Sequence, residues 1–266
     1  MGDIVLLNDP DGPVVQIQLN RPEKKNAVNI QMLDALRVRA ESLEDMADVR
    51  CVVMSGAGGS FSAGLDTAIF LEFAKDIEAL KIEITNPPDG RVANRFQAPV
   101  LCWQELPVPV IAAIEGVCFG AGMQLALAAD FRIAAPTAKL SIMEGKWGLI
   151  PDMGITQSLP NLMRMDQAKE LIMTARILDA HEALSLGLIT RIENDPMGAA
   201  LELANEIAER SPDAIRATKA LLNTGWNASR RDALALEAAL QAEIIGGHNQ
   251  IEAVMANIQK RAPKFS

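Results

Sequence analysis

The chain has 266 residues, a formal net charge of -9 and 49% hydrophobic residues. Such a chain can bury a large core, so an intrinsically disordered protein is excluded. The acidic balance argues against a general binder of nucleic acids or acidic membranes, although it permits a local basic patch for a phosphorylated ligand. Aromatic residues make up only 4%, so Ala, Leu, Ile and Val must fill the core.

The start of the chain has neither a basic segment nor a long apolar segment, and we expect no signal or transit peptide. Cys51, Cys102 and Cys118 lie in or beside apolar runs without metal-ligand spacing, which favours buried free thiols in a reducing, cytoplasmic compartment. The two histidines, His181 and His248, lie in helical contexts. We therefore expect neither a His-based metal site nor a Ser/His triad.

The first pattern along the chain is the alternation of residues 14–19, which predicts a strand. A polar, Pro-containing loop follows at 20–29, and Asn29 at its end is expected to cap a helix with Leu33 and Leu36 on its buried face. The loop has three cations, Arg21, Lys24 and Lys25. Two interpretations remain open for them: they lie on a solvated surface, or they contact ligand phosphates.

A short buried strand is predicted at 51–54, and it leads into a loop of small residues at 55–66. This loop matches neither dinucleotide- nor phosphate-binding glycine motifs, and Ser62 lacks a base that would make it a nucleophile. Small residues here indicate that a ligand approaches the backbone. We expect a helix from Thr67 to Lys81, and then a loop at 82–98 broken at Pro-Pro-Asp-Gly.

The central stretch runs from Ile111 to Gln157, and the apolar run from Val108 to Ile114 leads into it. It predicts a buried strand, a turn at Gly120-Ala121-Gly122 and an apolar helix, an arrangement that presents bare backbone N–H groups to an anionic oxygen. A membrane span is disfavoured because Glu115 and Gln124 interrupt the apolar run.

Two carboxylates follow in loop-like sequence, Glu144 and Asp152. An anion hole with carboxylates nearby is what proton transfer beside a carbonyl group requires. Each residue also has a plainer interpretation: Glu144 as a surface carboxylate, and Asp152 as a turn or cap residue after Pro151.

The rest of the chain is mainly helical. Helices are predicted at 166–175 and 179–186, the second opened by a capping box of Asp179 and Glu182. Beyond residue 196 almost everything is helical, and Ser211 before Pro212 marks one helix start. We expect a mixed core at 1–195 and a helical region at 196–266.

Five segments in order resemble the crotonase, or enoyl-CoA hydratase/isomerase, superfamily, and the resemblance covers nearly the whole chain. They are L-N-R-P-E-K-K-N-A-V-N at 19–29, S-G-A-G-G-S-F-S-A-G-L-D at 55–66, I-A-A-I-E-G-V-C-F-G-A-G-M-Q-L-A-L-A-A-D at 111–130, G-L-I-P-D-M-G-I-T-Q at 148–157 and Q-K-R-A-P-K-F at 259–265.

The resemblance implies an α/β fold, a crotonase-like spiral of ββα units with a C-terminal helical trimerisation region, usually assembled as homotrimers or hexamers. It implies an acyl-CoA thioester as ligand, no metal, and no cofactor beyond the coenzyme A of the substrate. By the resemblance, the oxyanion-hole donors match the N–H groups of Ala63 and Ala121. The CoA-contacting positions match, in chain order, Lys25, Asn26, Ala27, Leu65, Asp66 and Lys260, the last sometimes reaching a neighbouring subunit.

One departure bears on the reaction. Hydratases of this family carry two glutamates, and this chain has Gln124 where the first stands, while Glu144 matches the second. A glutamine cannot take or give a proton near neutral pH, so two-carboxylate hydration is in doubt. We expect Gln124 to line the site without taking part in the chemistry. Isomerases that use one glutamate fit better. Asp152 matches an aspartate of dienoyl-CoA isomerases. It also matches the nucleophilic acid of dehalogenase-type relatives, but these have a Trp where this chain has Glu144, so the resemblance to them is weaker.

We therefore favour an enoyl-CoA isomerase in which Glu144 moves the proton, Asp152 assists, and Ala63 and Ala121 hold the enolate. A one-carboxylate hydratase is the second enzymatic hypothesis. A non-catalytic acyl-CoA-binding subunit is the alternative from another class, and a peptidase of similar fold is weaker because neither histidine has a serine partner. No nucleic-acid or membrane partner is expected.

Overall fold

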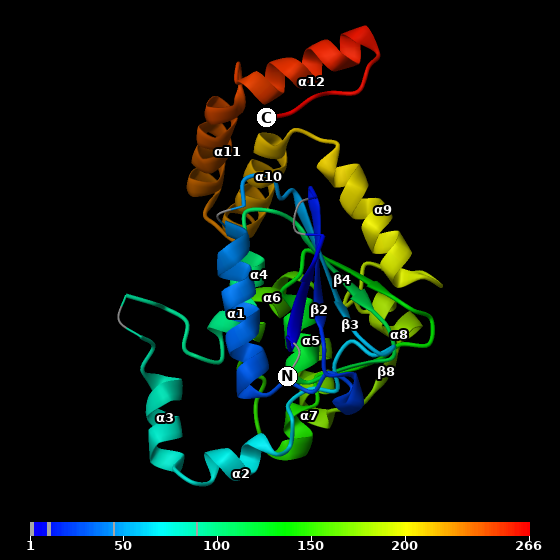
Figure 1. The fold of residues 1–266 in the computed structure, drawn as a ribbon. Coiled ribbons are helices and arrows are strands. Elements are labelled where there is room, and N and C mark those ends of the chain that lie inside the picture. Colours follow the sequence, from blue (N-terminus) through cyan, green and yellow to red (C-terminus); the bar gives the residue numbers. More distant parts are fainter. Residues whose placement is uncertain (1–2, 10–11, 45, 89) are drawn as a thin grey trace.

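Two β-sheets form the centre of the computed structural model, which describes residues 3–9, 12–44, 46–88 and 90–266 (Figure 1). The larger sheet has the strand order β1-β2-β3-β4-β6-β9, with β1 and β2 antiparallel and the other neighbours parallel. The smaller sheet has the order β5-β7-β8. The strands are β1 Val5–Asn8, β2 Val14–Leu19, β3 Cys51–Gly56, β4 Val110–Ile114, β5 Val117–Phe119, β6 Phe131–Ala134, β7 Lys139–Ser141, β8 Leu178–Asp179 and β9 Arg191–Ile192.

The chain spirals between these two sheets. After β4 in the larger sheet it enters β5 in the smaller one and then forms α5 (Ala121–Leu127), and β6 and β7 repeat the step. Ser62, beyond β3, makes an isolated parallel bridge with Cys118 of β5. The loop after β3 is thereby placed beside the loop after β5, and this pairing positions the site described below.

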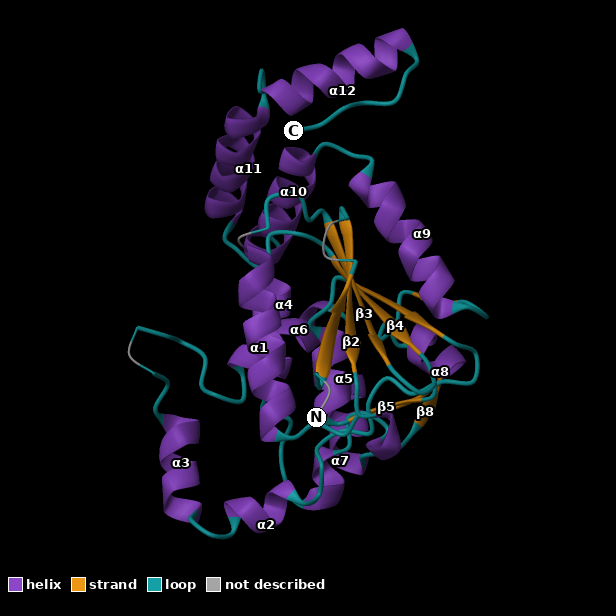
Figure 2. Ribbon diagram, viewed as in Figure 1, coloured by secondary structure: helices purple, strands orange, loops and turns teal. Residues whose placement is uncertain are grey.

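Both faces of the larger sheet are buried, as expected of parallel strands covered by helices. Val52 and Met54 face the main core with α1 and α4, while Cys51 and Val53 face a smaller core beneath α9. Figure 2 shows α1 and α4 on one side of the strands and α9 on the other. The sequence of β3 is therefore continuously apolar over its first four residues.

Helices and short 3-10 turns complete the fold. Their bounds are η1 Pro22–Lys24, α1 Ile30–Glu44, α2 Ile69–Phe73, α3 Ile77–Thr85, α4 Ala98–Glu105, η2 Glu144–Trp147, α6 Ile155–Ser158, η3 Leu159–Asn161, α7 Met165–Thr174, α8 Ala180–Ser185, α9 Pro196–Ala208, α10 Pro212–Gly225, α11 Arg230–Ile244 and α12 His248–Gln259.

Several helix starts have the caps expected from the sequence. The side-chain oxygen of Asn29 accepts from the N–H of Met32 at 2.9 Å, and Asp179 caps α8. Ser211 caps α10 directly before Pro212. Each cap satisfies an N–H group that has no partner inside its helix.

The helix predicted at 67–81 is wrong as a single element. The structure has two short helices, α2 and α3, separated at Asp76, whose side chain accepts from the N–H of Ala79 and opens α3. Asp76 is thus an N-cap inside an apolar pattern that otherwise runs on. In the Pro-Pro-Asp-Gly break that follows, Asp89 lies outside the described residues.

The expected division at residue 195 falls just before α9. Ala200 and Ala204 of this helix are buried against Ile111 and Ile133 of the larger sheet. The first helix of the 196–266 region therefore shares the core of the region before it. In contrast, α10, α11 and α12 project from one end of the molecule (Figure 1).

One buried cation joins α10 to the core. The Nζ atom of Lys219 lies 2.8 Å from Oδ2 of Asp130 and donates to the carbonyl of Val108 at 2.9 Å. The same Asp130 oxygen accepts from the N–H of Val110 at 2.7 Å. The start of β4 and helix α10 are held by a single charge pair.

None of the helices in the described ranges combines the length and apolarity needed to span a bilayer.

Candidate active site

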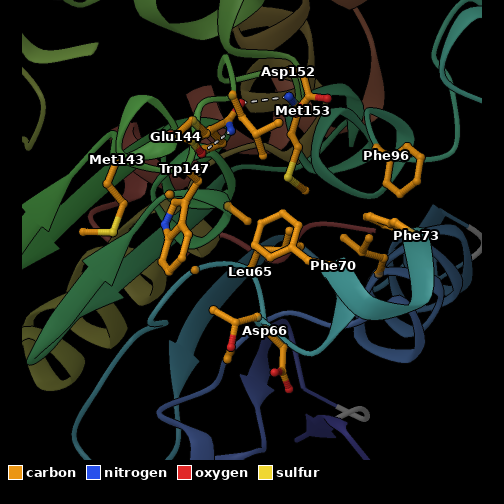
Figure 3. A pocket seen from close by; sticks show the side chains of 18 of the residues that line it. Leu65, Asp66, Phe70, Phe73, Phe96, Met143, Glu144, Trp147, Asp152 and Met153 are labelled. Carbon is orange, nitrogen blue, oxygen red and sulfur yellow. Dashed lines mark hydrogen bonds between the residues drawn. The ribbon is translucent and has the colours of Figure 1, made fainter. Parts of the chain in front are cut away.

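A cavity of about 560 Å³ opens between α2, α3, the loops after β3 and β5, and the segment from η2 to Met153. Its size lies within the range of small-molecule sites. Figure 3 shows Glu144 and Asp152 on one side of it and Asp66 on the opposite side, with aromatic residues between. Of the residues predicted to form the site, Ala27, Ala63, Leu65, Asp66, Ala121, Gln124, Glu144 and Asp152 line it.

The parallel bridge between Ser62 and Cys118 places two equivalent backbone positions side by side. Leu65 and Ala121 each lie three residues beyond the bridge, and both line the cavity. The intervening backbones touch closely, since a Cβ atom built on Gly64 would lie 2.9 Å from the carbonyl oxygen of Phe119. Within the described ranges, neither the Leu65 nor the Ala121 N–H donates to a protein acceptor.

This geometry corrects the prediction that the Ala63 N–H is an oxyanion donor. Its N–H donates to the carbonyl oxygen of Lys25 at 2.8 Å, so that group is occupied and cannot serve as an oxyanion donor in this conformation. Leu65, two residues further on, lines the cavity and has an N–H with no protein acceptor among the described residues. The sequence motif thus named a loop that lines the cavity, but the amide it named is not a free donor.

Ala121 keeps the expected position at the first residue of α5. An N–H at the first turn of a helix has no carbonyl partner within the helix and carries a partial positive charge. Gly120 before it has φ 49°, a left-handed conformation that favours glycine. A Cβ atom at this position would lie 3.3 Å from Oε1 of Glu144. The carboxylate therefore lies next to the residue that precedes the helix.

Glu144 is half-buried at the start of η2. Its Oε1 atom accepts from Nε2 of Gln124 at 2.7 Å, whereas Oε2 is buried and has no hydrogen-bond partner within the described residues. Burial raises the pKa of this carboxyl group, and the negative charge of Asp152 raises the pKa further. A carboxylate with a raised pKa and one unused oxygen is suited to accept a proton.

Gln124 is held at both ends of its amide group. Nε2 donates to Glu144, and Oε1 accepts from the N–H of Met153 at 2.8 Å (Figure 3). Only 2% of the residue is exposed. Because the carboxylate can only accept and the backbone N–H can only donate, the two bonds determine the orientation of the amide. Gln124 thereby joins η2 to the loop before α6.

Asp152 lies beside this network but is not part of it. It lines the cavity and is exposed to solvent, and its partial burial raises the pKa of its carboxyl group. The cavity thus contains two carboxyl groups with raised pKa values. Asp152 is not engaged as the cap of α6, which begins at Ile155 after Gly154.

Not all residues of the loop expected to contact coenzyme A line the cavity. Asn26 is fully buried, and its side-chain Nδ2 donates to the carbonyls of Ala57 and Ser60 at 2.8 and 2.7 Å. This side chain supports the neighbouring loop and is not available to a ligand, which corrects its predicted binding role. Ala27 lines the cavity, and so does Lys24 in place of the expected Lys25, whose side chain is exposed outside it.

Asp66 lines the cavity while paired with Arg21 at 2.9 Å. A hydrogen bond from the N–H of Ala68 and the Arg21 guanidinium hold the pKa of Asp66 below its ordinary value. Arg21 also donates to the carbonyl of Ala27. Of the three cations of the 20–29 loop, Arg21 therefore holds the loop in place.

Lys260 lies far from the cavity of its own chain. It follows α12 at the end of the molecule opposite α2 and α7 (Figure 1) and is exposed. Its predicted contact with a CoA phosphate therefore requires a second copy of the chain.

The sequence did not reveal the apolar wall that α2 and α3 provide. Phe70 and Trp147 lie at the cavity with ring centroids 5.8 Å apart and ring planes tilted by 35°, and Phe73 and Phe96 meet edge to face at the same separation. The apolar spacing of residues 69–84 was the available signal, and it was interpreted as a helix to residue 81 followed by a loop. Elsewhere, no group of three His, Cys, Asp or Glu side chains in the described ranges is arranged to hold a metal ion.

Two free backbone N–H groups beside a partly buried carboxylate, inside an apolar cavity, are typical of enzymes that move a proton next to a carbonyl group. A profile of the family described as enoyl-CoA hydratase/isomerase matches residues 10–266. The chain belongs to this family, and the expected crotonase-like α/β fold is confirmed.

Similar proteins and solved structures support the same family assignment. Mitochondrial methylglutaconyl-CoA hydratase of Mus musculus is 34% identical over 97% of this chain and 81% of its own length. Short-chain-enoyl-CoA hydratase of Clostridium acetobutylicum is 33% identical over 95% and 94%. A crystal structure of enoyl-CoA hydratase from Bacillus anthracis superposes with a TM-score of 0.88 at 31% identity, covering 98% of both chains.

Proposed function

We propose that this protein is an enoyl-CoA isomerase, which shifts a carbon–carbon double bond by moving a proton near the thioester. Glu144 removes a proton from the carbon next to the thioester carbonyl. The same carboxyl group then returns this proton to the resulting enolate, at a carbon further along the acyl chain. Atoms and charge balance without any other reactant.

The enolate oxygen would accept hydrogen bonds from the Leu65 and Ala121 N–H groups. Both are rigid backbone donors with no protein acceptor among the described residues, and they emerge at equivalent positions beyond one bridge. Donors already oriented toward a developing negative charge need no rearrangement during the reaction. The loss of one such donor typically costs about 2.7–4 kcal/mol of transition-state stabilisation.

The observation that carries the proposal is the hydrogen-bonded Gln124. It stands where two-carboxylate hydratases have an acid, and both of its polar atoms are engaged, with Glu144 and Met153. An amide in this position cannot donate a proton to a substrate carbon or activate water as an acid–base group. It leaves Glu144, whose Oε1 lies next to Gly120, as the proposed base, and Oε2 of Glu144 has no partner among the described residues.

Hydration of an enoyl-CoA is the second candidate, and two observations favour it. The relatives described above are named as hydratases. Asp152 also supplies a second carboxyl group with a raised pKa, which could orient a water molecule in the place of the missing glutamate. The non-catalytic binding subunit is less well supported, because Glu144 lines the cavity and lies beside Gly120.

The purified protein should be incubated with 3-enoyl-CoA and 2-enoyl-CoA, and the products analysed by mass spectrometry. Isomerisation leaves the mass unchanged, whereas hydration adds one water. The proposal predicts interconversion of the two substrates at constant mass. A hydroxyacyl product as the main outcome would favour the hydratase, and binding without turnover would favour the non-catalytic subunit.

We also propose that the chain assembles with copies of itself, as a trimer or a hexamer. Apolar side chains are exposed along the last helices, and an apolar surface of this kind needs a partner. They are Leu222, Trp226, Leu234, Ile245, Ile251, Val254, Met255 and Ile258. In such an assembly Lys260 of one copy would reach a CoA phosphate bound to its neighbour.

A reducing compartment, and thus the cytoplasm, fits the state of the cysteines. Cys51, Cys102 and Cys118 are free, and burial raises the pKa of Cys51 and Cys102 to about 12. Such thiols stay protonated and unreactive at neutral pH. The mouse relative is named as mitochondrial, so an organelle is the alternative.

A further inference from the structure

The cavity has an apolar end beyond the catalytic carboxylates. Side chains from three helices and the segment before α4 close this end, and none of them is charged. They are Leu33 of α1, Phe73 of α2, Ile77, Leu80 and Ile84 of α3, and Phe96.

The apolar end is closed on the side of α1 and partly open along α3, where Ile77 and Ile84 are 45% and 37% exposed. Leu33 is 2% exposed, and Phe96 is 8% exposed and packs edge to face on Phe73. Figure 3 places Phe73 and Phe96 on the side of the cavity away from Met143 and Trp147. A chain that extends from the catalytic centre past Phe70 would thus run along apolar side chains.

No cation lines the cavity at this end, within the described residues. Lys75, between α2 and α3, is exposed and lies outside the lining. The cations of α3 and of the segment after it are paired on the outer surface: Lys81 with Glu78 at 2.6 Å, Arg95 with Glu83 at 3.4 Å, and Arg91 with Glu41 at 3.7 Å. None of these three cations lines the cavity.

The charged residues that do line the cavity lie elsewhere. Lys24 and Asp66 belong to the loops expected to contact coenzyme A, and Glu144 and Asp152 flank the reacting centre. Three of these four carry negative charge when ionised. An acyl group that ends in a carboxylate would therefore meet apolar side chains at its far end and like charge behind it.

We propose that this enzyme selects acyl groups that end in an uncharged hydrocarbon chain of medium length and rejects those that end in a carboxylate. The inference rests on the proposed function for its reaction but concerns the acyl end alone. Each methylene moved from water into an apolar site contributes to binding, whereas a carboxylate loses its hydration there without compensation. A methylglutaconyl group ends in a carboxylate, so this chain differs in acyl selection from the enzyme that its mouse relative's name describes.

Binding of saturated acyl-CoA thioesters, measured by calorimetry, tests the selection without requiring turnover. The series runs from butanoyl- to dodecanoyl-CoA, alongside CoA monothioesters of dicarboxylic acids of matching length. We expect the dissociation constant to fall about fourfold per added methylene until the cavity is filled. We expect the terminal carboxylate to weaken binding at least about tenfold at equal length. Equal affinity for the two kinds of thioester, or no gain with length, would overturn the proposal.

Leu80→Arg places a cation at the apolar end. Its matched control is Ile82→Arg, because Ile82 lies on the same helix, is 60% exposed and does not line the cavity. The first variant should narrow or reverse the preference against the terminal carboxylate, and the control should bind as the unmodified protein does. The same change in both variants would contradict the assignment.

Phe73→Ala provides a test that needs no buried charge. It should reduce the affinity for decanoyl-CoA and leave that for butanoyl-CoA nearly unchanged. A uniform loss for both would contradict the proposal. If the chain-length series behaves as expected while 3-enoyl-CoA is not isomerised, the acyl selection stands and the proposed reaction fails.

Discussion

At the scale of single residues, three polar groups control the proton. Gln124 occupies Oε1 of Glu144, Oε2 has no partner among the described residues, and Asp152 adds like charge nearby. Desolvation alone would favour the neutral acid, and the Gln124 hydrogen bond opposes this by stabilising the charged form. The pKa of Glu144 is the result of these opposing effects.

Glu144→Gln should abolish most of the turnover while binding is retained. The variant preserves the size of the side chain but removes the group that accepts the proton, and general-base catalysis typically contributes about 10²–10⁴-fold. Steady-state kinetics should show the loss in kcat, with the dissociation constant for a saturated acyl-CoA changed little. Turnover at the level of the unmodified protein would refute the role of Glu144 as base.

The pH dependence of activity should report the same carboxyl group. Glu144 acts as a base only when ionised, and its pKa is raised, so kcat/KM should fall on acidification at a pH above the ordinary range of a glutamate. Gln124→Met removes the hydrogen bond that lowers this pKa, and Gln124→Glu adds a neighbouring negative charge. Both should move the acid limb to higher pH.

Asp66→Asn serves as the control for these profiles, since Asp66 is paired with Arg21 and its pKa is lowered. Its substitution should affect binding of the substrate but not the position of the acid limb. An acid limb that stays in place in both Gln124 variants would show that another group controls it.

At the scale of elements, the site depends on the close approach of α5 and the loop after β3. A Cβ atom built on Gly122 would lie 2.4 Å from Cβ of Ser62, so the helix can pack here only with glycine. The Ser62 hydroxyl in turn donates to the carbonyl of Asn26 and accepts from the N–H of Gly64. One contact therefore positions both loops that carry the proposed donors.

Gly122→Ala should destabilise the fold by about 1–3 kcal/mol, as overpacking does, although alanine is the better helix former. Gly12→Ala is the matched control, because a Cβ atom there would meet its nearest neighbour at 3.7 Å. Chemical denaturation should separate the two variants. Equal stability would mean that the backbone adjusts at no cost.

Much of this architecture could be predicted from the sequence. The alternation at 14–19 defines β2, the Asp179 and Ser211 caps mark their helices, and the small-residue turn at 120–122 opens α5. The smaller sheet was not predicted, because strands of two or three residues carry too little periodicity to be recognised.

In the site, the Gly-rich turn and the two carboxylates found from the sequence, and the loops implied by the family resemblance, line one cavity. Spacing could not show that the Ala63 N–H is taken by Lys25 or that the Asn26 side chain is used internally, because both depend on pairing between distant segments. The apolar end of the cavity depends on how α2 and α3 fold back, which local propensity does not determine.

At the scale of the whole molecule, α2 and α3, which line the cavity, and the last two helices, α11 and α12, lie at opposite ends (Figure 1). Helix α11 has no buried residue, and α12 exposes Ile251, Val254 and Ile258. A self-complementary assembly would bury these side chains and bring the helices of one copy toward the cavity of another.

Ile258→Glu should therefore lower the assembled mass measured by analytical ultracentrifugation, because burying a charge in an apolar contact is unfavourable. Val92→Glu is the control, since Val92 is 96% exposed on the loop after α3. Lys260→Ala should keep the assembly and raise KM for the CoA thioester. A monomeric unmodified protein would contradict this view of the C-terminal helices.

The Lys219–Asp130 pair has a consequence for protein engineering. A chimera that takes its last three helices from another family member would introduce or remove one half of this buried pair unless both positions are exchanged together. An unmatched half leaves a polar group enclosed without its counterpart, which typically costs about 3–5 kcal/mol. Successful recombination between relatives should therefore depend less on where the crossover falls than on whether residues 130 and 219 come from the same parent.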